Sequence, residues 1–118
     1  MKFKSINPFN GETVGEYSSL SVDQLKAKLD LSHSAFKTWK NVPVKDRAEL
    51  MRKAGAILRA NTSEYAAMIT LEMGKPITES KAEVIKCAWV CEYYADNAAA
   101  FLSDEVIATD AQKKFCAT

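Results

Sequence analysis

Residue types that often carry chemistry are few among the 118 residues of this chain, which holds three cysteines and one histidine. Cys87 and Cys91 are four positions apart, so on a helix they would share one face. Two thiols on one face could bind zinc, but a zinc site needs two more ligands, and His33 lies in another predicted helix. We therefore expect both cysteines to be buried core thiols, with metal binding as the alternative.

Cys116, in the segment KKFCAT, could act as a nucleophile only with a nearby base or helix amino terminus, and the sequence offers neither. His33 has no accompanying triad or metal set, so we expect a partly exposed helix residue. The motifs GxGxxG, GxSxG and HExxH are absent from the sequence. The residues by themselves therefore assign no catalytic, cofactor-binding or metal-binding residue to this chain.

The stretch LEMGKP, residues 71–76, could be mistaken for a phosphate-binding loop. That loop needs GxxxxGK followed by Ser or Thr, after a buried strand, whereas here Pro76 follows Lys75 and a helical pattern precedes Gly74. A glycine directly after a periodic run, with a proline soon after it, is typical of a helix end. We therefore predict that this stretch ends one helix and begins the next.

Four aromatic residues could stack on bases or on a ring-shaped ligand, or could pack against neighbouring helices. They are Trp39, Trp89, Tyr93 and Tyr94. Because they follow helical spacing in a chain of balanced charge, we expect helix packing. A net charge of +1, with both signs interspersed, also argues against a nucleic-acid-binding groove.

The elements that would position these residues follow from turn chemistry and periodicity. Around NPFNGE, two β-prone runs predict a hairpin in residues 2–19. Four amphipathic helices are predicted in residues 21–102, and 103–118 form a tail with a short β-prone start. The predicted fold class is thus mainly α, four amphipathic helices preceded by a short β-hairpin, in one partial domain that spans residues 1–118.

Local signals mark the helix ends. Ser21 and Gln24 form a predicted capping box at the first helix, Pro43 separates the first two helices, and Asn61 with Glu64 resembles another capping pair. In the first helix the predicted apolar stripe consists of Val22, Leu25, Leu29, Phe36 and Trp39. In the second helix the residues expected to face inward are Leu50, Met51, Ala54, Ile57 and Leu58. In the last helix the stripe consists of Val84, Cys87, Ala88, Cys91, Tyr94, Ala95, Ala98, Phe101 and Leu102, whose alanines permit close approach of a neighbour.

Composition sets broad limits. A chain of this length can bury roughly 65% of the surface that its unfolded form exposes, so we expect a hydrophobic core that needs no disulfide or metal ion to stabilise it. No apolar run approaches the roughly 18 residues of a membrane span, and the start MKFKSINPF lacks the apolar stretch of a signal peptide. An odd number of cysteines without disulfide or zinc spacing suits free thiols in a reducing compartment. We therefore expect a cytosolic protein without membrane or nucleic-acid partners.

Three spaced motifs together resemble the amino-terminal segment of the aldehyde dehydrogenase superfamily. They are SINPFNGE, EMGKPITESKAEV and CEYYADNA, against the family's NPxTGE, ExGKPxxEAxxEV and YYA. The resemblance extends from about Ile6 to about Leu102 and is most similar to succinate-semialdehyde dehydrogenases. It implies a fragment of an α/β cofactor-binding domain from an enzyme that oxidises an aldehyde to a carboxylic acid with NAD or NADP.

The same resemblance implies that the chain itself is inactive. The family's PWNFP, GSTxxG, ELGG and GQxC segments, with its nucleophilic cysteine and its general-base glutamate, come later than the matched part. The family continues after the region of VIATDAQKK into a PLG turn, so we expect 103–118 to be a truncated tail. The expected partners are the remainder of the parent chain and a second copy, through exposed apolar surface. A stand-alone helical interaction module is the alternative.

Overall fold

A hairpin opens the chain in the computed structural model, which describes residues 2–108, 110 and 115–116. Strand β1 (Lys2–Ile6) pairs antiparallel with β2 (Thr13–Ser18), and the register shifts between Ser5 and Ile6. In the turn, Gly11 has a φ of +75° and its N–H donates to the Asn7 carbonyl at 2.8 Å. This left-handed backbone favours glycine, so turn chemistry predicted the hairpin correctly.

Helix α1 (Val22–Trp39) begins at the predicted capping box. The Gln24 N–H donates to the Ser21 hydroxyl oxygen at 3.2 Å, and the Ser21 N–H donates to the Gln24 side-chain oxygen at 2.9 Å. Asp23 in the first turn and Lys37 in the last turn complement the helix dipole. Local interactions therefore explain why this segment is a helix.

Three further helices follow: α2 (Val44–Ala60), α3 (Thr62–Met73) and α4 (Ile77–Phe101). The predicted Asn61–Glu64 capping pair is wrong, because the Asn61 amide donates back to the Ile57 carbonyl at 3.0 Å. Asn61 ends α2 and directly precedes α3, so its side chain serves the unpaired carbonyls of α2. The predicted helix end at Gly74 is confirmed, since Gly74 has a φ of +69° and its N–H donates to Thr70.

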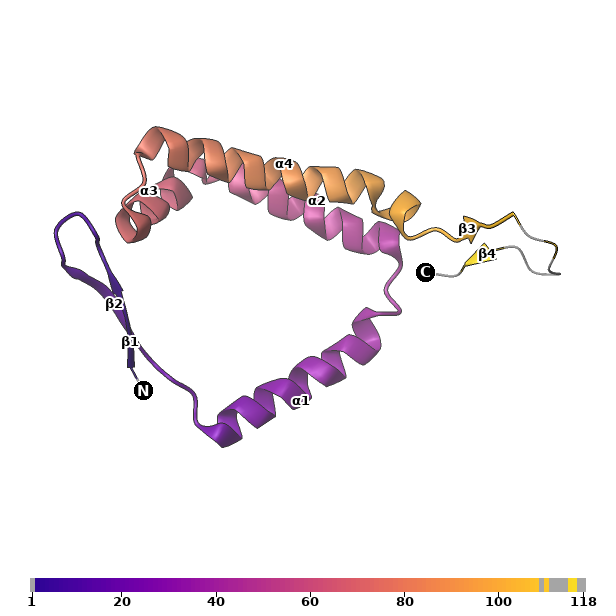
Figure 1. The fold of residues 1–118 in the computed structure, drawn as a ribbon, viewed down its shortest axis with the longest axis horizontal. Coiled ribbons are helices and arrows are strands. Elements are labelled where there is room, and N and C mark those ends of the chain that lie inside the picture. The colour runs from indigo at the N-terminus through magenta and orange to yellow at the C-terminus, as the bar shows by residue number, and fades with distance from the viewer. Residues whose placement is uncertain (1, 109, 111–114, 117–118) are drawn as a thin grey trace.

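Helices α2 and α4 lie side by side, and α3 packs against one end of α4 (Figure 1). The buried residues of these helices are mostly small: Ala48 and Gly55 on α2, Ala66 on α3, and Ser80, Val84, Ala88 and Ala95 on α4. A side-chain carbon added at Gly55 would lie 3.2 Å from the Ala88 carbonyl oxygen. The prediction that small residues allow a close helix pair is therefore confirmed.

Several larger residues expected in this core are instead exposed. This group consists of Leu50, Met51 and Ile57 of α2, Tyr94 and Phe101 of α4, and Leu102 directly after α4. Ala54, Leu58, Cys91 and Ala98 are only half-buried. The reason is that each helix meets its neighbour along a narrow strip of small side chains, which leaves the larger members of each stripe at its margins.

Helix α1 is set apart from the α2–α4 pair (Figure 1) and contains no buried residue. The radius of gyration is 20.6 Å, against about 13 Å for a compact chain of this length. The accessible surface is 9484 Å², against roughly 6,400 Å² for a compact protein of this mass. The expectation that the chain buries a full core by itself is therefore wrong.

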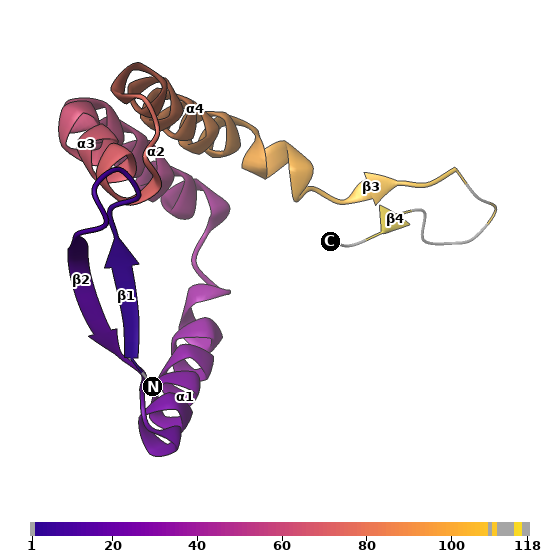
Figure 2. The same ribbon diagram turned by 60° about the vertical axis from the view of Figure 1, so that its left-hand side comes forward.

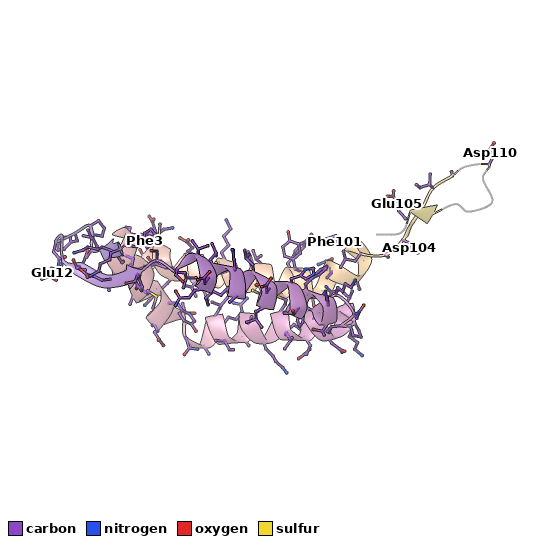
Figure 3. The ribbon with its side chains drawn as sticks, turned by 90° about the horizontal axis from the view of Figure 1, so that it is seen from below. Phe3, Glu12, Phe101, Asp104, Glu105 and Asp110 are labelled. Carbon is purple, nitrogen blue, oxygen red and sulfur yellow. The ribbon has the colours of Figure 1, made fainter. Side chains whose placement is uncertain are left out.

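Beyond α4, a short strand β3 (Glu105–Val106) lies at the predicted β-prone start of the tail. It pairs antiparallel with β4 (Phe115–Cys116), a strand that the sequence did not predict. Figure 3 shows Asp104, Glu105 and Asp110 extending past Phe101, at the end of the molecule opposite Glu12. Among the residues that the structure describes, no helix is long and apolar enough to cross a membrane.

Candidate functional surfaces

Two arginines of α2 reach across to acidic residues of α4. Arg59 donates from Nε and Nη2 to the two carboxylate oxygens of Glu92, each at 2.7 Å. About two turns earlier on α2 and one turn later on α4, Arg52 donates to Asp96 at 2.8 Å. Bidentate arginine–carboxylate geometry is specific as well as stabilising, so these bonds set the register of α2 against α4.

The same pairing changes the acidity of these groups. The hydrogen bonds from Arg59 lower the pKa of Glu92, and those to Glu92 raise the pKa of Arg59. The hydrogen bond to Asp96 likewise raises the pKa of Arg52. Because both partners of the Arg59–Glu92 pair remain 38% exposed, the pair lies at the rim of the helix interface and stabilises it only modestly.

The LEMGKP stretch joins α3, α4 and the hairpin (Figure 2). A side-chain carbon at Gly74 would lie 2.9 Å from Cγ of Pro8, and the Ser5 hydroxyl donates to Glu72 at 2.8 Å. Lys75 is paired with Glu83 of α4, and this hydrogen bond raises the pKa of Lys75. The lysine therefore neutralises a neighbouring carboxylate, and the stretch is a structural junction, as the sequence predicted.

A hydroxyl pair, of which Ser80 is buried and Thr70 half-buried, reinforces this junction. Ser80 is fully buried on the first turns of α4, and its hydroxyl lies 3.0 Å from that of Thr70 on α3. A buried hydroxyl is costly unless it has a partner, so the pair fixes how α3 meets α4. Neither Ser80 nor Gly55 was singled out from the sequence. The available signal was the run of small residues at positions 80, 84, 88 and 95 of α4.

An aromatic surface, made of Trp89, Tyr93, Tyr94 and Phe101, covers the outer side of α4. The Tyr93 and Tyr94 rings meet edge to face, with centroids 5.4 Å apart, and both approach the Phe101 ring. These four side chains are between 52% and 68% exposed. Trp89, Tyr93 and Tyr94 also line a hollow of about 530 Å³ together with Lys86 and Asp96. The prediction that Trp89, Tyr93 and Tyr94 pack against neighbouring helices of this chain is wrong.

The apolar stripe of α1 forms a second exposed surface, which we call the α1 stripe. It consists of Val22, Leu25, Leu29, Phe36 and Trp39, which are between 47% and 69% exposed. Trp39 therefore does not pack as predicted either. Surfaces of this kind on folded proteins commonly mark contacts with another protein or another domain.

The cysteines differ from what the sequence indicated. Cys87 is exposed and Cys91 is half-buried, so the prediction of two buried core thiols is wrong. Cys87 precedes the buried Ala88 by one residue, and one residue on a helix is a rotation of about 100°. His33 is exposed on α1, as expected. The Cys116 side chain lies outside the described residues, and the described residues contain no group of three or more His, Cys, Asp or Glu that could hold a metal ion.

Sequence comparison gives a consistent result along the whole chain. Residues 1–118 match the family described as "Aldehyde dehydrogenase family". A protein of Synechocystis sp. named "Probable succinate-semialdehyde dehydrogenase [NADP(+)]" is 44% identical over 117 residues, which cover 99% of this chain and 26% of that protein. A succinate semialdehyde dehydrogenase [NAD(P)+] of Escherichia coli is 41% identical over 101 residues, which cover 86% of this chain and 22% of that protein.

Solved structures show the same fold. Succinic semialdehyde dehydrogenase from Streptococcus pyogenes, in complex with NADP+, superposes with a TM-score of 0.88 and 29% identity over 94% of this chain and 25% of that one. An aldehyde dehydrogenase from Brucella melitensis biovar abortus superposes with a TM-score of 0.84 and 31% identity over 95% of this chain and 23% of that one. The chain thus spans about a quarter of the length of the relatives it matches.

Proposed function

The chain belongs to the aldehyde dehydrogenase family, and we propose that it is the amino-terminal helical part of the cofactor-binding domain of an NADP-dependent succinate-semialdehyde dehydrogenase. The observation that carries this proposal is the 44% identity to the Synechocystis protein over 99% of the chain. The enzyme would oxidise succinate semialdehyde to its carboxylic acid, and NADP+ would accept the hydride.

Within such an enzyme these residues act as a scaffold and supply none of the reacting groups. The described residues do not fit a dinucleotide site, because the four glycines of the sequence are scattered at positions 11, 15, 55 and 74. The space beside Gly55 is filled by residues of α4, and the space beside Gly74 is filled by Pro8. We therefore assign no step of the reaction to a residue of this chain and expect the chain alone to be inactive.

The contribution of the scaffold is positional. Helices α2, α3 and α4 are joined by two arginine–carboxylate pairs between α2 and α4 and by the hydroxyl pair of Ser80 and Thr70. The α1 stripe and the aromatic surface are large, apolar and exposed, and would pack against the remainder of the enzyme subunit. This chain has about 3,000 Å² more accessible surface than a compact chain of its mass, and that surface is available for such packing.

A chimera tests this scaffold role. The matching segment of the Synechocystis protein is replaced by this chain, and NADPH formation with succinate semialdehyde is measured for the chimera, for the truncated Synechocystis protein without the segment, and for this chain alone. We expect activity in the chimera only. Turnover by this chain alone would overturn the proposal, and so would a folded chimera that stays inactive where the intact Synechocystis protein is active.

A second candidate, a stand-alone module that binds a second copy of itself, is favoured by the exposure of the α1 stripe. Sedimentation velocity of the isolated chain over a wide concentration range tests it. A well-defined dimer that also unfolds cooperatively would support such a module. A monomer at all concentrations would exclude self-association and leave the scaffold role as the account of these surfaces.

A further inference from the structure

Helix α1 presents an apolar face that the described part of the chain leaves uncovered. The five residues of the α1 stripe are between 47% and 69% exposed, and α1 contains no buried residue. The helix lies apart from the α2–α4 pair (Figure 1). Its start is closed by its own capping box, so this end of the helix does not depend on a tertiary neighbour. The face is therefore free to meet a partner outside the chain.

Lysines flank the α1 stripe on both sides. At about 100° per residue, Lys28 lies about 75° from the centre of the stripe on one side, and Lys26 and Lys37 lie about 85° and 105° from it on the other. Asp23 and Asp30 lie farther round the helix, at about 145° and 125°. The positive charges thus border the apolar face, and the negative charges lie farther from it.

The last turn of α1 continues this pattern. Lys40 caps the helix, and its Nζ lies 5.7 Å from the centroid of the Phe36 ring. A lysine side chain can lie along apolar surface while its ammonium group reaches polar groups at the edge. Trp39 lies at the same end of the stripe, and tryptophan is favoured at the boundary between lipid and water.

This distribution of charge suits a flat anionic surface. A protein groove would need acidic residues along both of its walls and a shape that matches the large side chains of the stripe. Anionic headgroups of a membrane meet the lysines on both flanks at once, and acyl chains adapt to an irregular apolar face. The aromatic surface of α4 lacks this pattern, because its hollow is lined by Glu92 and Asp96 as well as by Lys86.

We propose that α1 is an interfacial helix that binds the surface of a membrane containing anionic lipids. The α1 stripe enters the boundary of the acyl chains, and Lys26, Lys28 and Lys37 contact the headgroups. The expectation of no membrane partner depended on the absence of a spanning segment, which an interfacial helix does not need. The inference concerns the chain with its α1 stripe uncovered and goes beyond the proposed role in an aldehyde dehydrogenase, where the remainder of the subunit would cover the stripe.

The test is flotation of the full chain with two kinds of large vesicles, one of phosphatidylcholine alone and one of equal parts of phosphatidylcholine and phosphatidylserine. We expect binding to the vesicles with phosphatidylserine to be at least about 10-fold stronger, and this advantage to shrink as salt is added. Lys26→Gln/Lys37→Gln should weaken the binding by about 10-fold. Leu29→Ser should weaken it by a similar factor of about 10, because it removes apolar contact area.

Each variant has a matched control. Lys45→Gln/Lys53→Gln makes the same change of charge at exposed positions of α2. Leu31→Ser removes a leucine that is 70% exposed and lies about 135° from the centre of the stripe. Both controls should bind like the wild type, and circular dichroism checks that every variant keeps its helices.

Equal binding to the two kinds of vesicle, or binding to neither, would overturn the proposal. So would a loss of binding in the control variants as large as that in the α1 variants. A dimer in sedimentation velocity that Leu29→Ser abolishes, formed by a chain that binds neither kind of vesicle, would assign the α1 stripe to a second copy instead.

Discussion

Helices α1 and α4 are both long and amphipathic, yet they stand in opposite relations to the rest of the molecule. Helix α4 buries Ser80, Val84, Ala88 and Ala95 against α2 and α3, whereas α1 buries no residue. The capping box and the charged end residues of α1 are interactions within its own segment. A helical apolar stripe therefore predicts a helix, but it does not predict whether a neighbour in the same chain covers the stripe.

Small side chains at the interface let α2 and α4 approach each other closely. The α1 stripe consists of large side chains, which need a complementary surface of matching shape. Four substitutions test this difference between α1 and α4.

Gly55→Val should have the largest effect. Its new methyl groups would press on the Ala88 carbonyl, Glu92 and Cys91 across the α2–α4 interface, so we expect the free energy of unfolding to fall by about 2–3 kcal/mol. Urea denaturation followed by circular dichroism measures this. Ala56→Val, at the exposed neighbouring position, is the control and should cost about 0.5 kcal/mol. Equal losses in both variants would contradict the close helix contact.

Gly74→Ala should cost about 1–2 kcal/mol, because alanine resists the left-handed backbone at φ +69°. The added carbon would also meet Pro8, 2.9 Å away, so a Pro8→Ala background should recover part of the loss. Gly11→Ala is the matched control, since its φ is +75° but no atom lies within 4 Å of the added carbon. Strict additivity of Gly74→Ala and Pro8→Ala would show that the hairpin turn does not pack on this junction.

Glu92→Gln should have a smaller effect that depends on pH. Arg59 lowers the folded-state pKa of Glu92, so the pair stabilises the protein above the unfolded-state pKa of about 4.3 and this stabilisation is lost as pH falls through the folded value. The Tm difference between wild type and Glu92→Gln should therefore be constant from neutral pH down to about pH 5 and shrink at lower pH. Thermal melts across this range measure it, with Glu64→Gln, an exposed carboxylate on α3, as the control. A difference that grows on acidification would contradict the pairing.

Leu29→Glu should have the smallest effect on stability, within about 0.5 kcal/mol, because α1 buries nothing in this chain. Its effect should appear in self-association, which we expect to weaken when a charge enters the α1 stripe. Urea denaturation and sedimentation velocity measure the two quantities. Lys28→Glu, on the polar side of the same helix, is the control for charge. A loss of stability comparable to that of Gly55→Val would mean that the α1 stripe is buried within the chain.

Much of the fold was predictable because its boundaries depend on local chemistry. The Ser21 capping box, the Gly11 turn and the Gly74 helix end were each read from neighbouring residues and confirmed. The prediction of a helix cap at Asn61 was wrong because its side-chain amide can also donate to the last carbonyls of α2, and it donates to that of Ile57. The prediction for the cysteines was wrong because a broad apolar stripe along the 25-residue helix α4 does not show which of its residues face a neighbour, and Cys87 is exposed.

The approximate bounds of the helices and of the hairpin follow from neighbouring residues, since capping, turn formation and helix breaking act over a few positions. The family resemblance was also in the sequence, as spaced motifs. Which helix faces are buried could be seen only in the folded molecule, because burial depends on how closely two helices can approach. Gly55, Ser80 and Ala88 allow that approach because their side chains are small or absent.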